Sequence, residues 1–283
     1  MLTLDFTEQL AGFFEQNKRE HDGLLHYSSA LADNIRHVQL EFCNTPKKEE
    51  DFASLLRMNT GTLWHKWLDD NFVAKFDNVL TEVSIDEWAP EHCGGTLDML
   101  LQVDGLWYLY DYKVVNPLSI PFVAKTGGKS DHKWQTSGYW YAAKEMLAKK
   151  GEDLSPLIQV CYIPAFTGGQ GGNQQPFIAV FEPIDQDVFD KNMTARTNLA
   201  LKYREEVNES GGGIIQDSLV DCNMYEYKER KGKIVRVPHW RSKFCPYEGM
   251  KQDGVEVCGC AELSQKTLGP TAQWSHLIEE QVI

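Results

Sequence analysis

The protein has 283 residues, of which 42% are hydrophobic and 24% are charged. This composition is typical of a folded chain with its own core and excludes the disordered and fibrous classes. The net charge of −13 argues against non-specific nucleic-acid binding by the chain as a whole. No apolar run reaches the length of a membrane span, and the N-terminal segment soon turns acidic, unlike a secretion signal. We therefore predict a cytoplasmic protein.

The first part of the chain has the apolar spacing of helices. Ser28 and Ser29 are expected to cap a helix whose apolar positions continue to Phe42. A second helix is expected to start after residue 62. On that helix His65, Leu68 and Phe72 share the inward stripe, because residues three and four apart lie on one face.

The rest of the chain alternates between strand and helix patterns. Strands are predicted over 83–88, 96–103, 106–115, 157–163 and 176–181. Further helices are predicted over 134–149 and 185–209; three glycines at 211–213 end the second helix, and glycines at 168–172 form a hairpin tip. This order predicts an α/β protein with a mixed β-sheet flanked by helices. The expected regions are a helical N-terminal region (1–60), a core (61–210) and a small C-terminal lobe that contains cysteines (211–283).

A predicted β-hairpin concentrates charge. Asp104-Gly105 is a strong two-residue turn signal, and the register that it sets places Asp98 directly opposite Asp111. Lys113 lies on the same face as Asp111, because side chains alternate along a strand. Facing carboxylates destabilise a sheet unless a partner offsets their repulsion, and a divalent cation such as Mg²⁺ is the simplest partner. The alternative is an Asp–Lys surface ion pair, which the apolar flanks of this strand disfavour.

Three motifs in this region form a recognisable series. They are Gly95-Thr-Leu-Asp98, Asp111-Tyr-Lys113 and Gln135-Thr-Ser-Gly-Tyr139. In order and spacing the series resembles the GxxD, (D/E)xK and QxxxY motifs of RecB-family nucleases in the PD-(D/E)XK superfamily. The resemblance implies a restriction-endonuclease-like core over 61–210 and a Mg²⁺ or Mn²⁺ cofactor.

The same resemblance implies a role for each matching residue. His65, Asp98, Asp111 and the backbone carbonyl of Tyr112 would be metal ligands, and Lys113 would activate or position the attacking water. Gln135 and Tyr139 would line the catalytic site from one face of a helix. Glu82 is similar to an acidic residue that some members place near the metal, with a looser match.

The C-terminal quarter carries a cysteine pattern. Cys245-Pro-Tyr followed by Cys258-Gly-Cys260 resembles the cluster of the iron–sulfur branch of these nucleases, which includes phage exonucleases and CRISPR-adaptation members. The resemblance implies a [4Fe-4S] cluster with Cys43 as the fourth ligand, although the branch has its upstream cysteine at the position of Asn34. A zinc site and buried structural thiols remain open. The alternative ligands are Cys222 and His239, whereas Cys93 and Cys161 have the pattern of ordinary strand residues.

Positive charge is concentrated in two segments of this acidic chain. Seven lysines stand against two acidic residues between 112 and 150, and seven basic residues stand against one between 228 and 243. Such runs are often only solvated surface, but basic residues interleaved with aromatic ones suit single-stranded DNA or a frayed end. The resemblance implies a metal-dependent DNA exonuclease in recombination, replication or DNA processing, in a prokaryotic or phage-infected cell, acting with a recombination or replication partner. The alternative is a catalytically silent subunit that binds DNA ends or a protein partner.

Overall fold

The chain divides into two compact units, each described here by itself. A computed structural model describes residues 22–30, 35–47, 52–165, 175–219, 225–230, 233–238, 247, 251–252 and 255–256. The first unit comprises Met1–Ser28 and Glu50–Phe189, and the second comprises Ser29–Glu49 and Asp190–Ile283. The three sequence regions proposed above stay a prediction.

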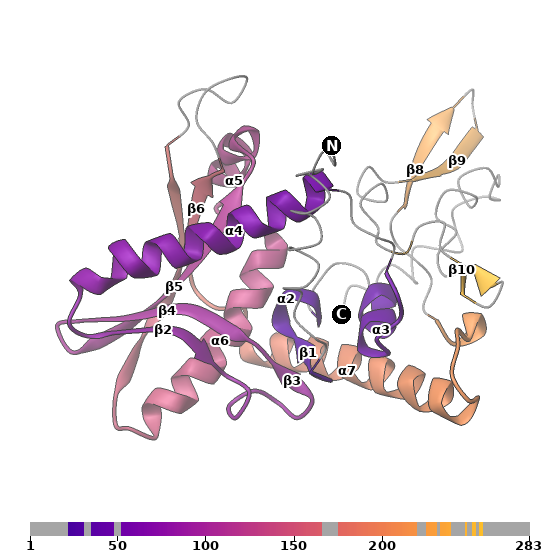
Figure 1. Ribbon diagram of the computed structural model, residues 1–283, viewed down its shortest axis with the longest axis horizontal. Coiled ribbons are helices and arrows are strands. Elements are labelled where there is room, and N and C mark those ends of the chain that lie inside the picture. Colours follow the sequence, from indigo (N-terminus) through magenta and orange to yellow (C-terminus); the bar gives the residue numbers. More distant parts are fainter. Residues whose placement is uncertain are drawn as a thin grey trace, which may run out of the picture. The chain divides into compact units, whose positions relative to one another are not determined.

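A five-stranded mixed sheet forms the centre of the first unit (Figure 1). Its strands, in spatial order, are β2 (Val79–Ser84), β4 (Thr96–Val103), β5 (Leu106–Val115), β6 (Asp153–Pro164) and β7 (Phe177–Phe181). Neighbouring strands are antiparallel except β5 and β6, which are parallel because a helical crossover joins them. The predicted α/β class with a mixed sheet flanked by helices is confirmed.

The β4–β5 hairpin agrees with its sequence signals. Asp104 and Gly105 both have positive φ, +52° and +83°, as a two-residue turn of this kind requires. Pairing runs from Val103 opposite Leu106 to Met99 opposite Tyr110, which is the predicted register. Both predicted strands have the observed bounds, because the turn and the alternation are local signals.

The strand predicted over 83–88 is wrong in its bounds, since β2 ends at Ser84. Ile85 is fully buried, but it begins a turn in which the Trp88 N–H donates to the Ile85 carbonyl. The Asp86 carboxylate then accepts a hydrogen bond from the Gly95 N–H at 2.9 Å. The strand was predicted to continue because an apolar residue buried in a turn has the same sequence pattern as a buried strand residue.

Helices cover both sides of the sheet, with α4 (Phe52–Asn71) crossing in front of the strands and α6 (Ser130–Ala148) behind them in Figure 1. Helix α4 starts eleven residues before the predicted position and contains Gly61, which is tolerated in a helix at a cost of about 1 kcal/mol. Helix α6 starts four residues earlier than predicted. The short helix α5 (Ile120–Thr126), which follows the 3₁₀ turn η2 (Pro117–Ser119), was not predicted.

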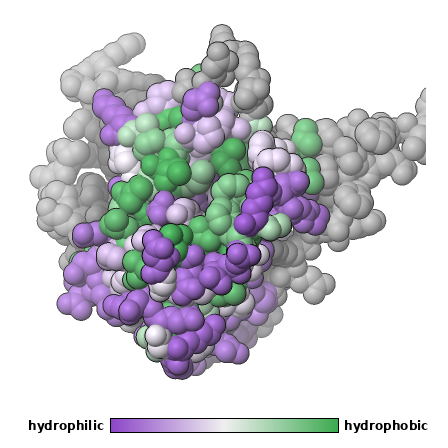
Figure 2. All heavy atoms as spheres, turned by 90° about the vertical axis from the view of Figure 1, so that its left-hand side faces the viewer, coloured by the Kyte–Doolittle hydropathy of each residue, from purple (hydrophilic) through white to green (hydrophobic). Residues whose placement is uncertain are grey.

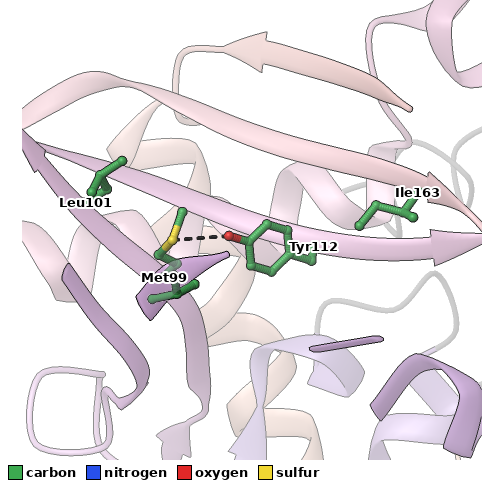
Figure 3. Packing of buried hydrophobic residues seen from close by; sticks show 5 residues of the cluster. Met99, Leu101, Tyr112 and Ile163 are labelled. Atoms are coloured by element: carbon green, nitrogen blue, oxygen red, sulfur yellow. Dashed lines mark hydrogen bonds between the residues drawn. The ribbon is translucent and has the colours of Figure 1, made fainter. Parts of the chain in front are cut away.

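One part of the core lies between α4 and the sheet. Met99, Leu101, Tyr112 and Ile163 pack together there, and the Tyr112 hydroxyl donates to the Met99 sulfur at 3.1 Å (Figure 3). Trp64 and Leu68 of α4 pack against this cluster. The inward position of Leu68 is thus confirmed.

The described N-terminal part of the first unit begins at Asp22. Strand β1 (Leu25–His26) pairs in parallel with β3 (Cys93–Gly94). Ser28 and Ser29 lie inside α2 (Tyr27–Ala30) and therefore do not cap a helix that continues to Phe42, as the sequence analysis expected. Such a cap residue stands outside the helix that it caps.

The second unit contains α3 (Ile35–Phe42) and most of α7 (Gln186–Glu209). The Gln39 side chain donates to the carbonyls of Leu199 and Ser218, while Leu40, Tyr203, Leu219 and Tyr247 form a small core. Glycines 211–213 follow α7 with positive φ, as a helix stop requires. The short elements that follow are η3 (Gln216–Ser218) and two antiparallel pairs, β8 (Tyr225–Arg230) with β9 (Lys233–Pro238) and β10 (Lys251–Gln252) with β11 (Val255–Glu256).

Large apolar side chains also reach the surface. Figure 2 shows hydrophobic side chains gathered in the middle of one face, with hydrophilic side chains mostly below them. Among the described residues, Leu63, Phe122 and Trp67 are 66%, 64% and 54% exposed. Within the described part of the chain, no helix has both the length and the apolar character that crossing a bilayer requires.

Candidate functional site

Three side chains from different elements meet at one end of the sheet. His65 comes from α4, Glu82 from β2 and Asp98 from β4, and one potential ligand atom of each lies within 4.8 Å of the other two. The His65 Nδ1 atom is 3.5 Å from Asp98 Oδ1 and 4.0 Å from Glu82 Oε1. Glu82 has a φ of +47° and follows Thr81, which pairs with Met99, so it stands opposite Asp98.

The His65 ring is oriented by the backbone. Its Nε2 atom is 3.2 Å from the Tyr112 carbonyl oxygen, and because a carbonyl can only accept, Nε2 carries the hydrogen of this bond. Nδ1 is then the nitrogen that faces the two carboxylates. Metal-binding histidines commonly donate their second ring N–H to a carbonyl or carboxylate in this way.

Asp98 is largely buried, with 12% of its side chain exposed. Its Oδ2 atom accepts a hydrogen bond from the Tyr112 N–H at 2.6 Å. Burial raises the pKa of Asp98 well above its usual range, and the neighbouring Asp111 carboxylate raises it further, while Lys113 opposes the shift. A second positive charge, in addition to that of Lys113, would therefore stabilise the ionised form of Asp98.

Asp111 and Lys113 form an ion pair on β5. Asp111 is fully buried, and the Lys113 ammonium donates to its Oδ1 atom at 3.0 Å. The ammonium is also 2.9 Å from Oδ2, but outside hydrogen-bonding geometry, so buried Oδ2 accepts no hydrogen bond. Burial lowers the pKa of Lys113, but the Asp111 and Asp98 carboxylates outweigh it, and the net shift is upward. Lys113 therefore holds its proton.

Helix α6 contributes Gln135 and Tyr139, one turn apart. The Gln135 amide donates to the Tyr139 hydroxyl at 2.9 Å. Burial and the charge of Asp111 raise the pKa of Tyr139 to about 12, so its hydroxyl stays protonated. The ring lies against Gly95, where a Cβ atom would be only 3.0 Å from Tyr139 Cε1, which explains a glycine at the start of the Gly95–Asp98 motif.

A cavity of about 650 Å³ joins these groups. Its lining residues come from the N-terminal segment, α4, β2, β4, β5 and α6: His26, Ser28, Gly61, Thr62, His65, Lys66, Asp69, Asp70, Glu82, Thr96, Asp98, Lys113, Gln135 and Tyr139. Six of the residues singled out in the sequence analysis therefore line one cavity. Asp111 is not among the lining residues or in the group of three; its contact is with Lys113.

Several cavity residues were missed by the sequence reasoning. Lys66, Asp69 and Asp70 follow His65 on α4, and the spacing of four between His65 and Asp69 was a signal for Asp69. His26 and Ser28 had no such signal, because their position depends on the pairing of β1 with β3.

His132 is a further group near the charged pair that the sequence reasoning did not use. The Tyr162 hydroxyl accepts from the Lys129 N–H and forms a hydrogen bond of 3.1 Å with His132 Nδ1. Burial, together with the charges of Lys113 and Lys129, lowers the pKa of His132 to about 4, although Asp131 and Asp111 oppose the shift. His132 is therefore neutral at physiological pH.

The cysteine prediction falls partly outside the described residues. The residues of this prediction that lie outside the described part of the chain are Cys222, His239, Cys245, Cys258 and Cys260. Cys43 is half-buried and packs against the small core of the second unit; burial raises its pKa to about 11, against the charge of Arg204. Cys93 and Cys161 lie in β3 and β6, as expected of strand residues.

No protein-family model matches the sequence, and no curated protein is similar to it. Among solved structures, the chain is similar to the protein SSO0001, with a TM-score of 0.41 and 12% identity over 70% of this chain and 87% of that chain. It is also similar to an alkaline exonuclease from Laribacter hongkongensis, with a TM-score of 0.43 and 14% identity over 67% of this chain and 93% of that chain. Because both TM-scores are below 0.5, no activity is carried over from either protein.

Proposed function

We propose that this protein is a metal-dependent deoxyribonuclease that hydrolyses phosphodiester bonds at DNA ends as an exonuclease. The observation that carries the proposal is the convergence of His65, Glu82 and Asp98 at one point of a cavity that Lys113 also lines. Asp98 is largely buried although Glu82 is exposed, and a charge on Asp98 beside Asp111 and Glu82 is costly unless a cation compensates it. Phosphodiester hydrolysis is the reaction that best uses such a cation beside an ammonium and a phenol.

The donor set fits Mg²⁺ or Mn²⁺. Carboxylate oxygens are the preferred ligands of these ions, and imidazole is an accepted additional ligand. His65 Nδ1, Asp98 and Glu82 would hold the ion, and the buried Asp111 Oδ2 atom, which accepts no hydrogen bond, is a further oxygen donor close by. The Tyr112 carbonyl, predicted as a ligand, accepts from His65 and would act by orienting that ring. A bound cation would supply a Lewis acid for the phosphoryl oxygen.

Lys113 would position the attacking water and the phosphate. Its raised pKa keeps it an ammonium, which donates hydrogen bonds but cannot take a proton. Asp111 fixes the ammonium at the cavity wall through two contacts of 3.0 and 2.9 Å. Of the two roles that the resemblance implied for this lysine, positioning of the water is therefore the one that its protonation state favours.

Gln135 and Tyr139 would bind the substrate. Because Gln135 uses its amide N–H on Tyr139, its carbonyl oxygen is available to accept from a water molecule. Tyr139 accepts that bond and keeps its own O–H as a donor for a phosphate oxygen. Both side chains line the cavity.

DNA with an unpaired end is the substrate class that the charge distribution supports. The chain is acidic overall, but seven lysines stand against two acidic residues between 112 and 150, the segment that contains Lys113 and α6. Lysines in this segment would attract phosphates locally. We propose a role in recombination, replication or DNA processing, with a recombination or replication protein as a partner.

The test is cleavage of end-labelled linear single- and double-stranded DNA. We expect degradation with Mg²⁺ or Mn²⁺, none with chelator, and at least a hundred-fold loss in Lys113→Ala, in line with the loss of about 10²–10³ when one positioned hydrogen-bond donor is removed from a catalytic site. Lys202→Ala, which removes an exposed lysine of the second unit, is the matched control and should cleave normally. Cleavage that survives Lys113→Ala would refute the site, whereas binding without cleavage under every metal would favour the silent subunit.

We further infer that Cys43 joins the C-terminal cysteines 245, 258 and 260 in an iron–sulfur cluster. The supporting observation is that Cys43 packs against a core that includes Tyr247, two residues from Cys245 in the sequence. Anaerobically purified protein should then be coloured and contain iron, and Cys43→Ser should lose both. A colourless protein with bound zinc would replace the cluster by a zinc site, and a protein without metal would leave structural thiols.

A further inference from the structure

Helix α4 lines two pockets, not one. Lys66 and Asp70 line the cavity described above, and they also line a second pocket of about 530 Å³. Leu63, Trp64 and Trp67 provide most of the wall of this second pocket. The two pockets therefore adjoin along the ridge of α4 that Lys66 and Asp70 form, where an ion pair of 3.4 Å joins their side chains.

The second pocket is apolar and aromatic. Leu63 and Trp67 are 66% and 54% exposed, which is unusual for two large neighbours on one helix face. Trp64 packs against the core between α4 and the sheet. The ring of Trp67 meets the ring of Trp64 edge to face, with 5.7 Å between the ring centroids. Trp67 is thus held in place by an anchored neighbour while much of its surface stays open.

We propose that Leu63, Trp64 and Trp67 form a stacking platform for an unpaired base of the DNA strand that enters the adjoining cavity. The inference rests on the proposed nuclease function and specifies its substrate as single-stranded or frayed. A helix with its side chains is about 10–12 Å across, so nucleotides of one extended strand can reach both sides of α4. Lys66, on the ridge, is placed to meet the phosphate between them.

A base is the occupant that fits this pocket best. Aromatic side chains bind bases of any sequence through their faces, and a base paired in a duplex cannot offer its face. A protein partner or a second copy of this chain would need about 20–30 residues on each side for a standard interface. Among the described residues, the six that line the pocket all belong to α4, and the continuity of the pocket with the charged cavity favours a ligand that carries both phosphates and rings.

The test is the affinity for a fluorescein-labelled oligothymidylate, measured by anisotropy in chelator so that no cleavage occurs. We expect Trp67→Ala to raise the dissociation constant by about five-fold or more, since one stacked base is commonly worth that much. Trp67→Phe, which keeps an aromatic face, should restore most of the affinity. The matched control is Phe122→Ala, which removes an exposed aromatic side chain that lines neither pocket and should bind normally. Blunt duplex DNA should be bound equally by all four proteins.

The outcomes separate this inference from the proposed nuclease function. Unchanged oligothymidylate binding by a folded Trp67→Ala variant would overturn the platform, even if cleavage still depends on Lys113. Trp67-dependent binding without cleavage by the native chain would leave the platform and overturn the nuclease. A native dimer that Trp67→Ala converts to a monomer, with DNA affinity intact, would show that this face joins two copies and would also overturn the inference.

Discussion

The β4–β5 hairpin and helix α4 both supply charged side chains to the same cavity, but they hold them under different conditions. On the hairpin, the side chains of Asp111 and Lys113 are 1% and 19% exposed. On the helix, those of Lys66 and Asp70 are 73% and 58% exposed. Buried charges are costly and must be satisfied, whereas exposed ones are hydrated and cost little. The difference teaches that two ion pairs that each contribute a residue to one cavity, at 2.9 and 3.4 Å, can have very different consequences when they are broken.

The largest expected effect comes from breaking the buried pair. Lys113→Ala leaves the Asp111 carboxylate buried without its counter-charge, and we expect the free energy of unfolding to fall by about 3–5 kcal/mol. Urea denaturation in chelator measures this change. The double variant Asp111→Leu with Lys113→Met should recover most of the stability, because apolar residues need no partner, yet remain inactive. A double variant as unstable as the single one would contradict this account.

The next effect concerns the packing that places Gln135 and Tyr139. A Cβ atom at Gly138 would lie 2.7 Å from a ring carbon of Tyr27, so Gly138→Ala should lower the free energy of unfolding by about 1–3 kcal/mol. It should also reduce DNA cleavage by displacing α6.

Gly61 is the matched control for that helical glycine. Nothing lies within 4 Å of a Cβ atom there, so Gly61→Ala should raise stability by about 0.5–1 kcal/mol through helix propensity. Thermal unfolding of both variants would show the opposite signs. Equal signs would mean that the Tyr27 contact does not constrain Gly138.

At Asp98 we expect an effect on stability that is smaller than that of Gly138→Ala and opposite to it in sign. Asp98→Asn removes a buried charge beside Asp111 while keeping an oxygen acceptor for the Tyr112 N–H. Without divalent cations, the variant should be more stable than the native chain by about 1 kcal/mol. Added Mg²⁺ should raise the melting temperature of the native chain but hardly that of the variant. Equal Mg²⁺ responses would show that Asp98 is not a ligand.

The smallest effect is expected on the ridge of α4. Asp70→Ala breaks the exposed Lys66–Asp70 pair and should change the free energy of unfolding by no more than about 0.5 kcal/mol. Urea denaturation beside Lys113→Ala makes the comparison direct. If the free energy of unfolding fell as much as in Lys113→Ala, exposure to solvent would not determine how much these ion pairs contribute to stability.

The strand bounds and pairing register of residues 96–115 could be predicted from the sequence alone. The Asp104-Gly105 turn and the alternation around it fixed the bounds of β4 and β5 and the register that runs from Val103 to Met99. The end of α7 at Glu209, before three glycines, was also predicted from the sequence. These features depend on residues close together in the chain, where turn chemistry and side-chain period act directly.

Only the tertiary structure decided what surrounds that hairpin. It brought Glu82 and His65 to Asp98, and it left Leu63 and Trp67 of α4 exposed. Phe72, which follows α4, is also exposed, although it was expected on the inward stripe. It also buried Ile85 in a turn that the sequence pattern had suggested was a strand. Periodicity tells which residues share a face, but which face is covered depends on contacts with distant segments, and those contacts exist only once the chain has folded.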